Sequence, residues 1–183
     1  MELDNLFGLP AHPLLVHAVV VLVPLTAVGA VAAAFWPAAR ARVGWLVAAV
    51  AVGDVVLLPF VTGSGERLEE RLGENPLVQR HAQMGDHLLP WAAGLAVMAV
   101  AIMLIDRYAA RAAAGDGHGD GPGAARRTVW HQRAWAGVAA LVLTSVVATG
   151  TLVEVVRIGH SGAKASWSDV ANSGGEREEG DGH

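Results

Sequence analysis

Histidines are the residues of this sequence whose type and placement best suit chemistry. The chain contains four long apolar runs, over residues 14–36, 45–61, 88–105 and 134–156. The histidines near run ends that would share one membrane surface are His12, His17, His81, His87 and His160. Because neutral imidazole is a common ligand of metals and of haem iron, this placement predicts a histidine cluster and a cofactor site near that surface.

Two histidines on different helices can ligate a b-type haem, with one imidazole approaching each face of the ring. We expect His17 to be one such ligand and either His81 or His87 to be the other. His81 and His87 point about 120° apart on a straight helix, so they cannot share one ion. His81 and Met84 do share a face, and a His/Met pair suits copper or haem iron. The expected cofactor is therefore b-type haem or copper; alternatively, His17 is a neutral imidazole satisfied by a neighbouring carbonyl.

Other polar residues would surround this site. We expect His12 and His160 either to add metal ligands at its entrance or to contact lipid headgroups as interfacial residues. Asp54 lies inside the second apolar run, where a carboxylate costs about 2.5–3.5 kcal/mol on insertion scales. It should therefore face the bundle interior, have a partner, and orient or charge-balance a ligand. Glu154, near the end of the fourth run, completes the predicted pocket.

Composition indicates a membrane protein. Of the 183 residues, 53% are hydrophobic, and the mean hydropathy is +0.41. Each apolar run is close to the roughly 17–25 residues that a helix needs to cross a bilayer. The absence of cysteine excludes disulfides, thiolate catalysis, iron–sulfur clusters and c-type haem attachment. No nucleophile–base pair or phosphate-binding loop is present, so catalysis by this chain alone is not expected. The near-neutral body of the chain does not favour a nucleic acid partner.

The predicted fold is all-α, an integral membrane four-helix bundle within residues 1–167. Its helices are expected over about 14–36, 44–62, 76–105 and 134–156. Arginines are more frequent in the loops after the first and third helices, so the positive-inside rule predicts both termini on the outer side.

Glycine and proline set the expected limits of these helices. We expect a short turn over residues 37–43, an end to the second helix at Gly63-Ser64-Gly65, and a kink near residue 86 caused by Pro90. Residues 168–183 are acidic and rich in glycine and serine, which predicts a disordered tail.

The segment Phe7-Gly-Leu-Pro-Ala-His12-Pro-Leu-Leu-Val-His17 resembles the opening of a family of bacterial membrane proteins called domain of unknown function 2231. The later Gly159-His160-Ser161-Gly162-Ala163 is similar to the glycine-rich close of that family, and His81 fits a histidine that begins its third helix. The resemblance extends to about Trp167. It implies a four-helix membrane domain, found in some relatives beside redox domains, without a firmly established activity.

These observations lead to one main hypothesis and two alternatives. The main hypothesis is a small redox-associated subunit in a bacterial cell membrane, holding a b-type haem or a metal near the outer face through histidines. The first alternative is a proton- or solute-handling accessory protein that uses Asp54 as its titrating group, as a homo-oligomer if it transports on its own. The second is a structural anchor of a redox or envelope complex, with the acidic tail docking the protein partner. Lipid is a partner in all three.

Overall fold

The computed structural model describes the backbone of residues 5–6, 9–72, 76–115 and 123–179, and side chains chiefly over 14–67, 79–112 and 135–164. A minimal antiparallel ladder, in which Asn5 faces Pro10 and Leu6 faces Leu9, precedes the helices. The elements in chain order are β1 (Asn5–Leu6), β2 (Leu9–Pro10), α1 (Ala11–Phe35), α2 (Pro37–Leu72), α3 (Pro76–Asp86), α4 (Leu88–Gly115) and α5 (Gly123–Glu179).

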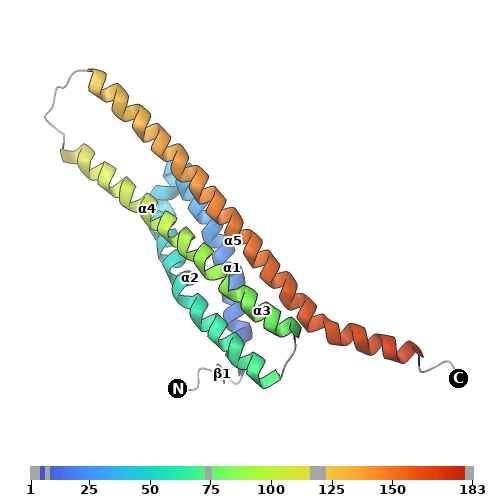
Figure 1. Ribbon diagram of the computed structural model, residues 1–183. Coiled ribbons are helices and arrows are strands. Elements are labelled where there is room, and N and C mark those ends of the chain that lie inside the picture. The colour runs from blue at the N-terminus through green and yellow to red at the C-terminus, as the bar shows by residue number, and fades with distance from the viewer. Residues whose placement is uncertain (1–4, 7–8, 73–75, 116–122, 180–183) are drawn as a thin grey trace.

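The helices form an antiparallel bundle in which the chain runs up α1, down α2, up α3 and α4, and down α5 (Figure 1). Both α1 and α4 pack against α2 and α5. Four segments are long and apolar enough to cross a membrane: Leu14–Phe35, Pro37–Arg67, Gln79–Ala112 and Trp135–Lys164. The predicted all-α four-helix membrane bundle is therefore confirmed.

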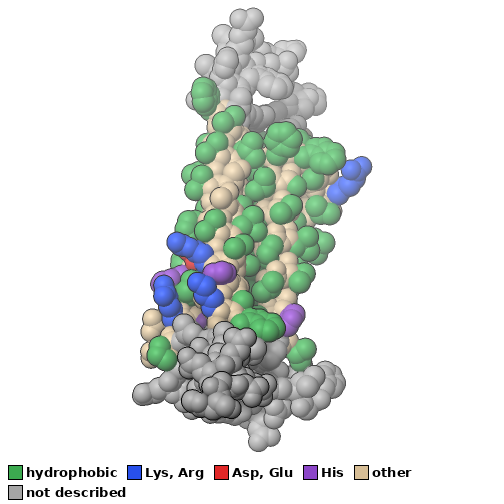
Figure 2. All heavy atoms as spheres, turned by 90° about the vertical axis from the view of Figure 1, so that its right-hand side faces the viewer, with side chains coloured by type: hydrophobic (Ala, Val, Ile, Leu, Met, Phe, Trp, Pro, Cys, Tyr) green, Lys and Arg blue, Asp and Glu red, His purple; other side chains and the backbone are tan. Residues whose placement is uncertain are grey.

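Two ends of this bundle differ in their polar residues. The histidine end comprises the start of α1, the last turns of the α2 span, α3, and residues 154–164 of α5. The arginine end comprises residues 35–45 around the α1–α2 junction and residues 104–112 of α4. On the face shown in Figure 2, hydrophobic side chains cover the middle, while the visible histidines lie at the histidine end.

The junction between α1 and α2 is shorter than the turn we predicted over residues 37–43. Trp36 alone separates the two helices. Its amide donates to the carbonyl of Ala32 at 2.8 Å, and its carbonyl accepts from the Arg40 amide at 3.0 Å. Pro37 then opens α2, where its fixed φ suits a first helical residue and its missing N–H leaves no donor unpaired.

The predicted end of the second helix at Gly63-Ser64-Gly65 is not found, because α2 continues to Leu72. Gly63 keeps a helical backbone and has open space beside it. The Ser64 hydroxyl donates to the Val61 carbonyl at 2.8 Å, back along the same helix. Each glycine costs a helix only about 1 kcal/mol relative to alanine, which the rest of a long helix can offset.

The third predicted helix is divided as Pro90 led us to expect. The break falls at His87, between α3 and α4. Pro90 has no N–H to donate to the Asp86 carbonyl. Next to Asp86, the His87 amide donates to the Met84 carbonyl at 3.2 Å, a tighter turn than that of an α-helix. In Figure 1, α3 and α4 follow one another along α5.

The fourth helix is longer than the predicted 134–156. Since no proline interrupts residues 123–179, α5 continues to Glu179. Residues 168–179 are thus helical where composition predicted a disordered tail. Residues 180–183 of that predicted tail lie outside the described residues.

Small residues let the helices approach closely inside the bundle. The buried core consists largely of alanine toward the arginine end and of valine and leucine toward the histidine end. A Cβ on Gly150 of α5 would overlap the six-membered ring of Trp91 on α4, and one on Gly44 of α2 would overlap the Met103 sulfur. Membrane helices commonly pack through such small residues, because the hydrophobic effect does not drive helices together within lipid and close van der Waals contact must do so.

Candidate functional site

A polar contact at the histidine end joins α3 to α5. Nδ1 of His81 lies 2.8 Å from Oγ of Ser161. The Ser161 hydroxyl donates its own proton to the Ile158 carbonyl at 2.8 Å. With the Ser161 proton on the Ile158 carbonyl, Ser161 accepts from Nδ1–H of His81, and in that tautomer the free lone pair of the imidazole is on Nε2.

Gly162 of α5 lies directly beside the same imidazole. A Cβ built on Gly162 would be 3.0 Å from Cε1 of His81 and 3.5 Å from Nε2. The imidazole ring therefore packs against the backbone of Gly162, and a larger residue at position 162 would displace the ring. His81, Ser161 and Gly162 belong to the two later segments on which the family resemblance is based, and the structure brings them together.

The other predicted histidines lie at the same end with less enclosure. His17 of α1 is exposed and takes part in an interaction within the structure. His87 is exposed at the α3–α4 break, and His160 is exposed on α5. The side chain of His12 lies outside the described residues. His81, by contrast, is half-buried and is held by the 2.8 Å contact with Ser161.

Met84 and Glu154 complete the predicted set. Met84 is half-buried on α3, one turn after His81. Glu154 accepts from Arg157 Nη1 at 3.2 Å within α5, so its charge is already paired. Among the described side chains, no three histidine or carboxylate groups come together as a metal site would require.

Asp54 occupies the bundle interior that its position in an apolar run required. Its side chain is 2% exposed. Oδ2 accepts a 2.9 Å hydrogen bond from the Thr26 hydroxyl of α1. Oδ1 is buried and has no hydrogen-bond partner among the described residues. The remaining buried polar residues described, Thr144 and Thr151, donate to carbonyls of their own helix at 2.7 and 2.8 Å.

Sequence reasoning did not single out three residues that contribute to these contacts. Ser161 was only part of a glycine-rich motif, although a hydroxyl beside a histidine end is a usable signal. Thr26 stands in an apolar run, where an isolated hydroxyl is a signal for some buried polar contact, although the run alone does not place it beside Asp54. Arg40 was counted as a loop charge, but its Nε lies 3.0 Å from Oδ1 of Asp106, and its Nη1 donates to the Ala33 carbonyl at 3.2 Å.

The fold and these contacts define an integral membrane four-helix bundle with a polar end built around a fixed imidazole. The sequence model of a family described as "Predicted membrane protein (DUF2231)" matches residues 8–174. The chain belongs to this family, as its opening and closing motifs led us to expect. No curated protein and no solved structure gives a significant match.

Proposed function

We propose that this protein is a small redox-associated membrane subunit that binds a b-type haem or a single metal ion at its histidine end, with His81 as the principal ligand. The observation that carries the proposal is the hydrogen-bond chain from His81 through Ser161 to the Ile158 carbonyl. Such an outer partner fixes the tautomer and orientation of a ligating imidazole and increases its basicity. The location proposed is a bacterial cell membrane, with the histidine end and both termini outside.

His17 is the second ligand in this proposal. It lies on α1, a different helix from His81, and at the same end of the bundle. A haem would be held by His17 of α1 and His81 of α3, because ligands on separate helices suit its binding. His12 and His160 would line the entrance, and Met84, on the face of His81, is the alternative soft ligand for copper.

A bound haem or copper would supply one-electron transfer, and the protein would supply its orientation. Ser161 holds the imidazole of His81, and Gly162 leaves room for the ring to lie against α5. Among the described residues, the hydrogen bond of Asp54 is with Thr26 and not with His81 or Ser161. Asp54 would act on the cofactor only through the field of its carboxyl group.

The test is spectroscopic and uses the full chain purified in detergent. We expect a Soret band that shifts on dithionite reduction, or stoichiometric iron or copper. His81→Ala should abolish cofactor binding, and Ser161→Ala should weaken it by about 10- to 100-fold, as loss of an outer hydrogen bond does elsewhere.

His87→Ala is the matched control, because His87 is an exposed histidine only six positions from His81 and should be dispensable. If the wild-type protein shows neither a Soret band nor stoichiometric iron, copper or zinc after expression with excess haem and metal, the proposal is wrong. Equal loss in His81→Ala and His87→Ala would remove His81 from its assigned role.

A second candidate function is favoured by the orphan oxygen of Asp54. A buried carboxyl group with one unpaired oxygen, at the middle of a membrane bundle, is the kind of group that marks proton pathways. In this reading the protein is a proton- or solute-handling accessory, and Asp54 takes up and releases the proton.

Proton flux in liposomes would decide between the two candidates. Asp54→Asn, which keeps the shape of the side chain and removes its charge, should stop flux and leave any cofactor spectrum unchanged. Thr144→Val, a buried polar change elsewhere in the bundle, should leave flux intact. Flux that persists in Asp54→Asn would exclude this second candidate.

A further inference from the structure

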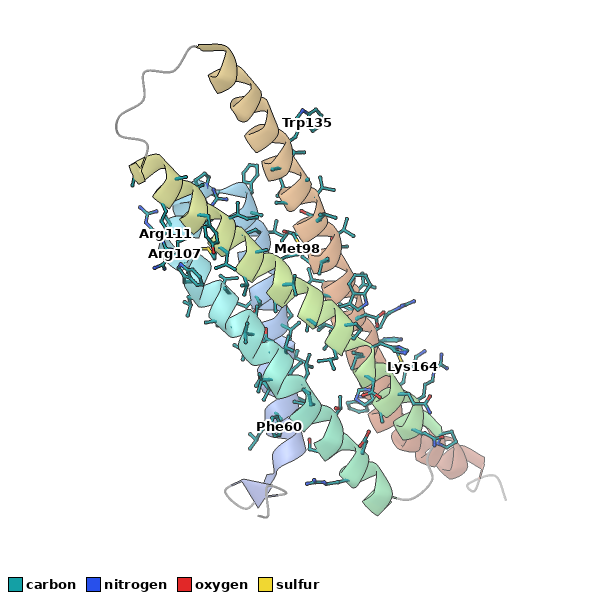
Figure 3. All side chains as sticks on the ribbon, turned by 60° about the vertical axis from the view of Figure 1, so that its left-hand side comes forward. Phe60, Met98, Arg107, Arg111, Trp135 and Lys164 are labelled. Atoms are coloured by element: carbon teal, nitrogen blue, oxygen red, sulfur yellow. The ribbon has the colours of Figure 1, made fainter. Side chains whose placement is uncertain are left out.

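The outward face of α4 near the arginine end carries apolar, aromatic and cationic side chains in order. Leu104, Arg107, Tyr108 and Arg111 follow the spacing i, i+3, i+4 and i+7, which aligns them on one face of a helix. All four are exposed, and Val97, two turns earlier on the same face, is 65% exposed. Figure 3 shows Arg107 and Arg111 on the same side of α4. The face thus changes from apolar to cationic along the helix.

The charges of this face are not compensated within the described part of the protein. Asp106 is the one acidic residue of α4 after Leu88, and it is held by Arg40 of α2 at 3.0 Å. Arg40 is fixed in turn by the Ala33 carbonyl, so this pair is neutral and tied into the junction. Arg107 and Arg111 have no ion-pair partner among the described side chains. Two cations therefore remain available on one face.

Aromatic residues place these cations at the depth of lipid headgroups. Trp36, Trp45 and Trp135 are exposed by 59%, 47% and 73%, and all lie toward the arginine end. Trp135 begins the apolar span of α5, and Figure 3 shows it near the same end as Arg111. Tryptophan and tyrosine gather at the interface between hydrocarbon and headgroups. Arg107 and Arg111 are consequently positioned where phosphate groups lie.

We propose that this α4 face is a binding site for an acidic phospholipid. Its phosphate would pair with the guanidinium groups of Arg107 and Arg111, and an acyl chain would lie along Leu104 and Val97. Arginine binds phosphate with two parallel hydrogen bonds, which distinguishes it from a diffuse positive charge. The apolar half of the face selects a lipid over free phosphate, because a free anion would have no use for it.

The experiment compares lipid retention by the full chain in native mass spectrometry, after mixing with phosphatidylglycerol and phosphatidylcholine in equal amounts. The wild-type protein should retain phosphatidylglycerol preferentially and gain thermal stability from it. The double variant Arg107→Gln/Arg111→Gln should lose that preference by about thirtyfold, since each basic residue near a membrane surface contributes about one kcal/mol to the attraction.

The matched control is Arg80→Gln/Lys164→Gln, which removes the same charge from exposed positions at the histidine end. It should keep the preference of the wild-type protein. Equal losses in both double variants would mean a general charge effect and would overturn the site. Displacement of phosphatidylglycerol by inorganic phosphate alone would show a free-anion site instead. Thermal melting in phosphatidylcholine verifies that each variant is folded. The preference of the wild-type protein for phosphatidylglycerol is also measured at increasing salt concentration, which tests the proposal without any variant.

Discussion

Thr26 and Asp54 join α1 to α2 by a buried 2.9 Å hydrogen bond, 28 residues apart in the chain. The hydroxyl serves one carboxyl oxygen and leaves the other without a partner among the described residues. Replacing Thr26 by valine would remove the hydrogen bond to Oδ2 of Asp54, so that neither carboxyl oxygen would have a partner among the described residues. We expect Thr26→Val to lower the free energy of unfolding by about 1–2 kcal/mol, measured by denaturation in mixed micelles.

Thr144→Val is the control for that change, since its hydroxyl is equally buried but bonds only within its own helix. It should cost clearly less than Thr26→Val. A double-mutant cycle with Asp54→Asn should give a coupling energy that Thr144→Val lacks. Equal losses for the two threonines would mean that the contact between helices has no stabilising role.

Close packing of α5 on α4 predicts opposite effects for two glycines of the same helix. Gly150→Ala would drive a methyl group into the Trp91 ring, and overpacking of this kind costs about 1–3 kcal/mol. Gly137 has nothing within 4 Å of its built Cβ, so Gly137→Ala should be neutral or stabilising by up to about 1 kcal/mol. Thermal melting of both variants checks this, and a tolerant Gly150→Ala would contradict the packing.

The position of α3, which carries His81, can be tested by cross-linking because the chain has no cysteine. A Cβ on Gly85 would be 3.5 Å from Cγ2 of Thr62 on α2, which is within reach of disulfide geometry after small adjustment. The pair Gly85→Cys/Thr62→Cys should oxidise readily in isolated membranes. Gly85→Cys/Gly63→Cys should not, since Gly63 faces open space. Equal cross-linking of both pairs would argue against a fixed α3.

Single cysteines also test the orientation in the membrane. Lys164→Cys and Arg42→Cys lie at opposite ends of the bundle, and both positions are exposed. If the histidine end faces outward, an impermeant maleimide added to intact cells should label the first and not the second. The reverse result would place the histidines on the inner side, and labelling of both would contradict the bundle.

Sequence reasoning predicted features that a single segment determines. The burial of Asp54 follows from its charge within an apolar run, and the break at His87 follows from the N–H that Pro90 lacks. The family of the chain followed from its opening and closing motifs. The burial of Asp54 and the break at His87 are local properties of solvation and of covalent structure, so no knowledge of neighbouring helices was needed to predict them.

Features that depend on the register between helices were not predicted. Thr26 could be named as the partner of Asp54, and Ser161 as that of His81, only once the helices were placed side by side. The continuation of α2 through Gly63-Ser64-Gly65 was missed for a related reason: glycine weakens a helix by a small amount, and the surrounding helix decides whether it continues.

The single residue between α1 and α2 affects how this protein can enter the membrane and meet other proteins. With only Trp36 as connector, the first two helices form a continuous hairpin, which we expect to enter the lipid as one unit. No loop extends between α1 and α2 that a soluble protein could bind. At the α1–α2 junction itself, an approaching partner meets the exposed Trp36 and the arginine that follows it in place of a loop.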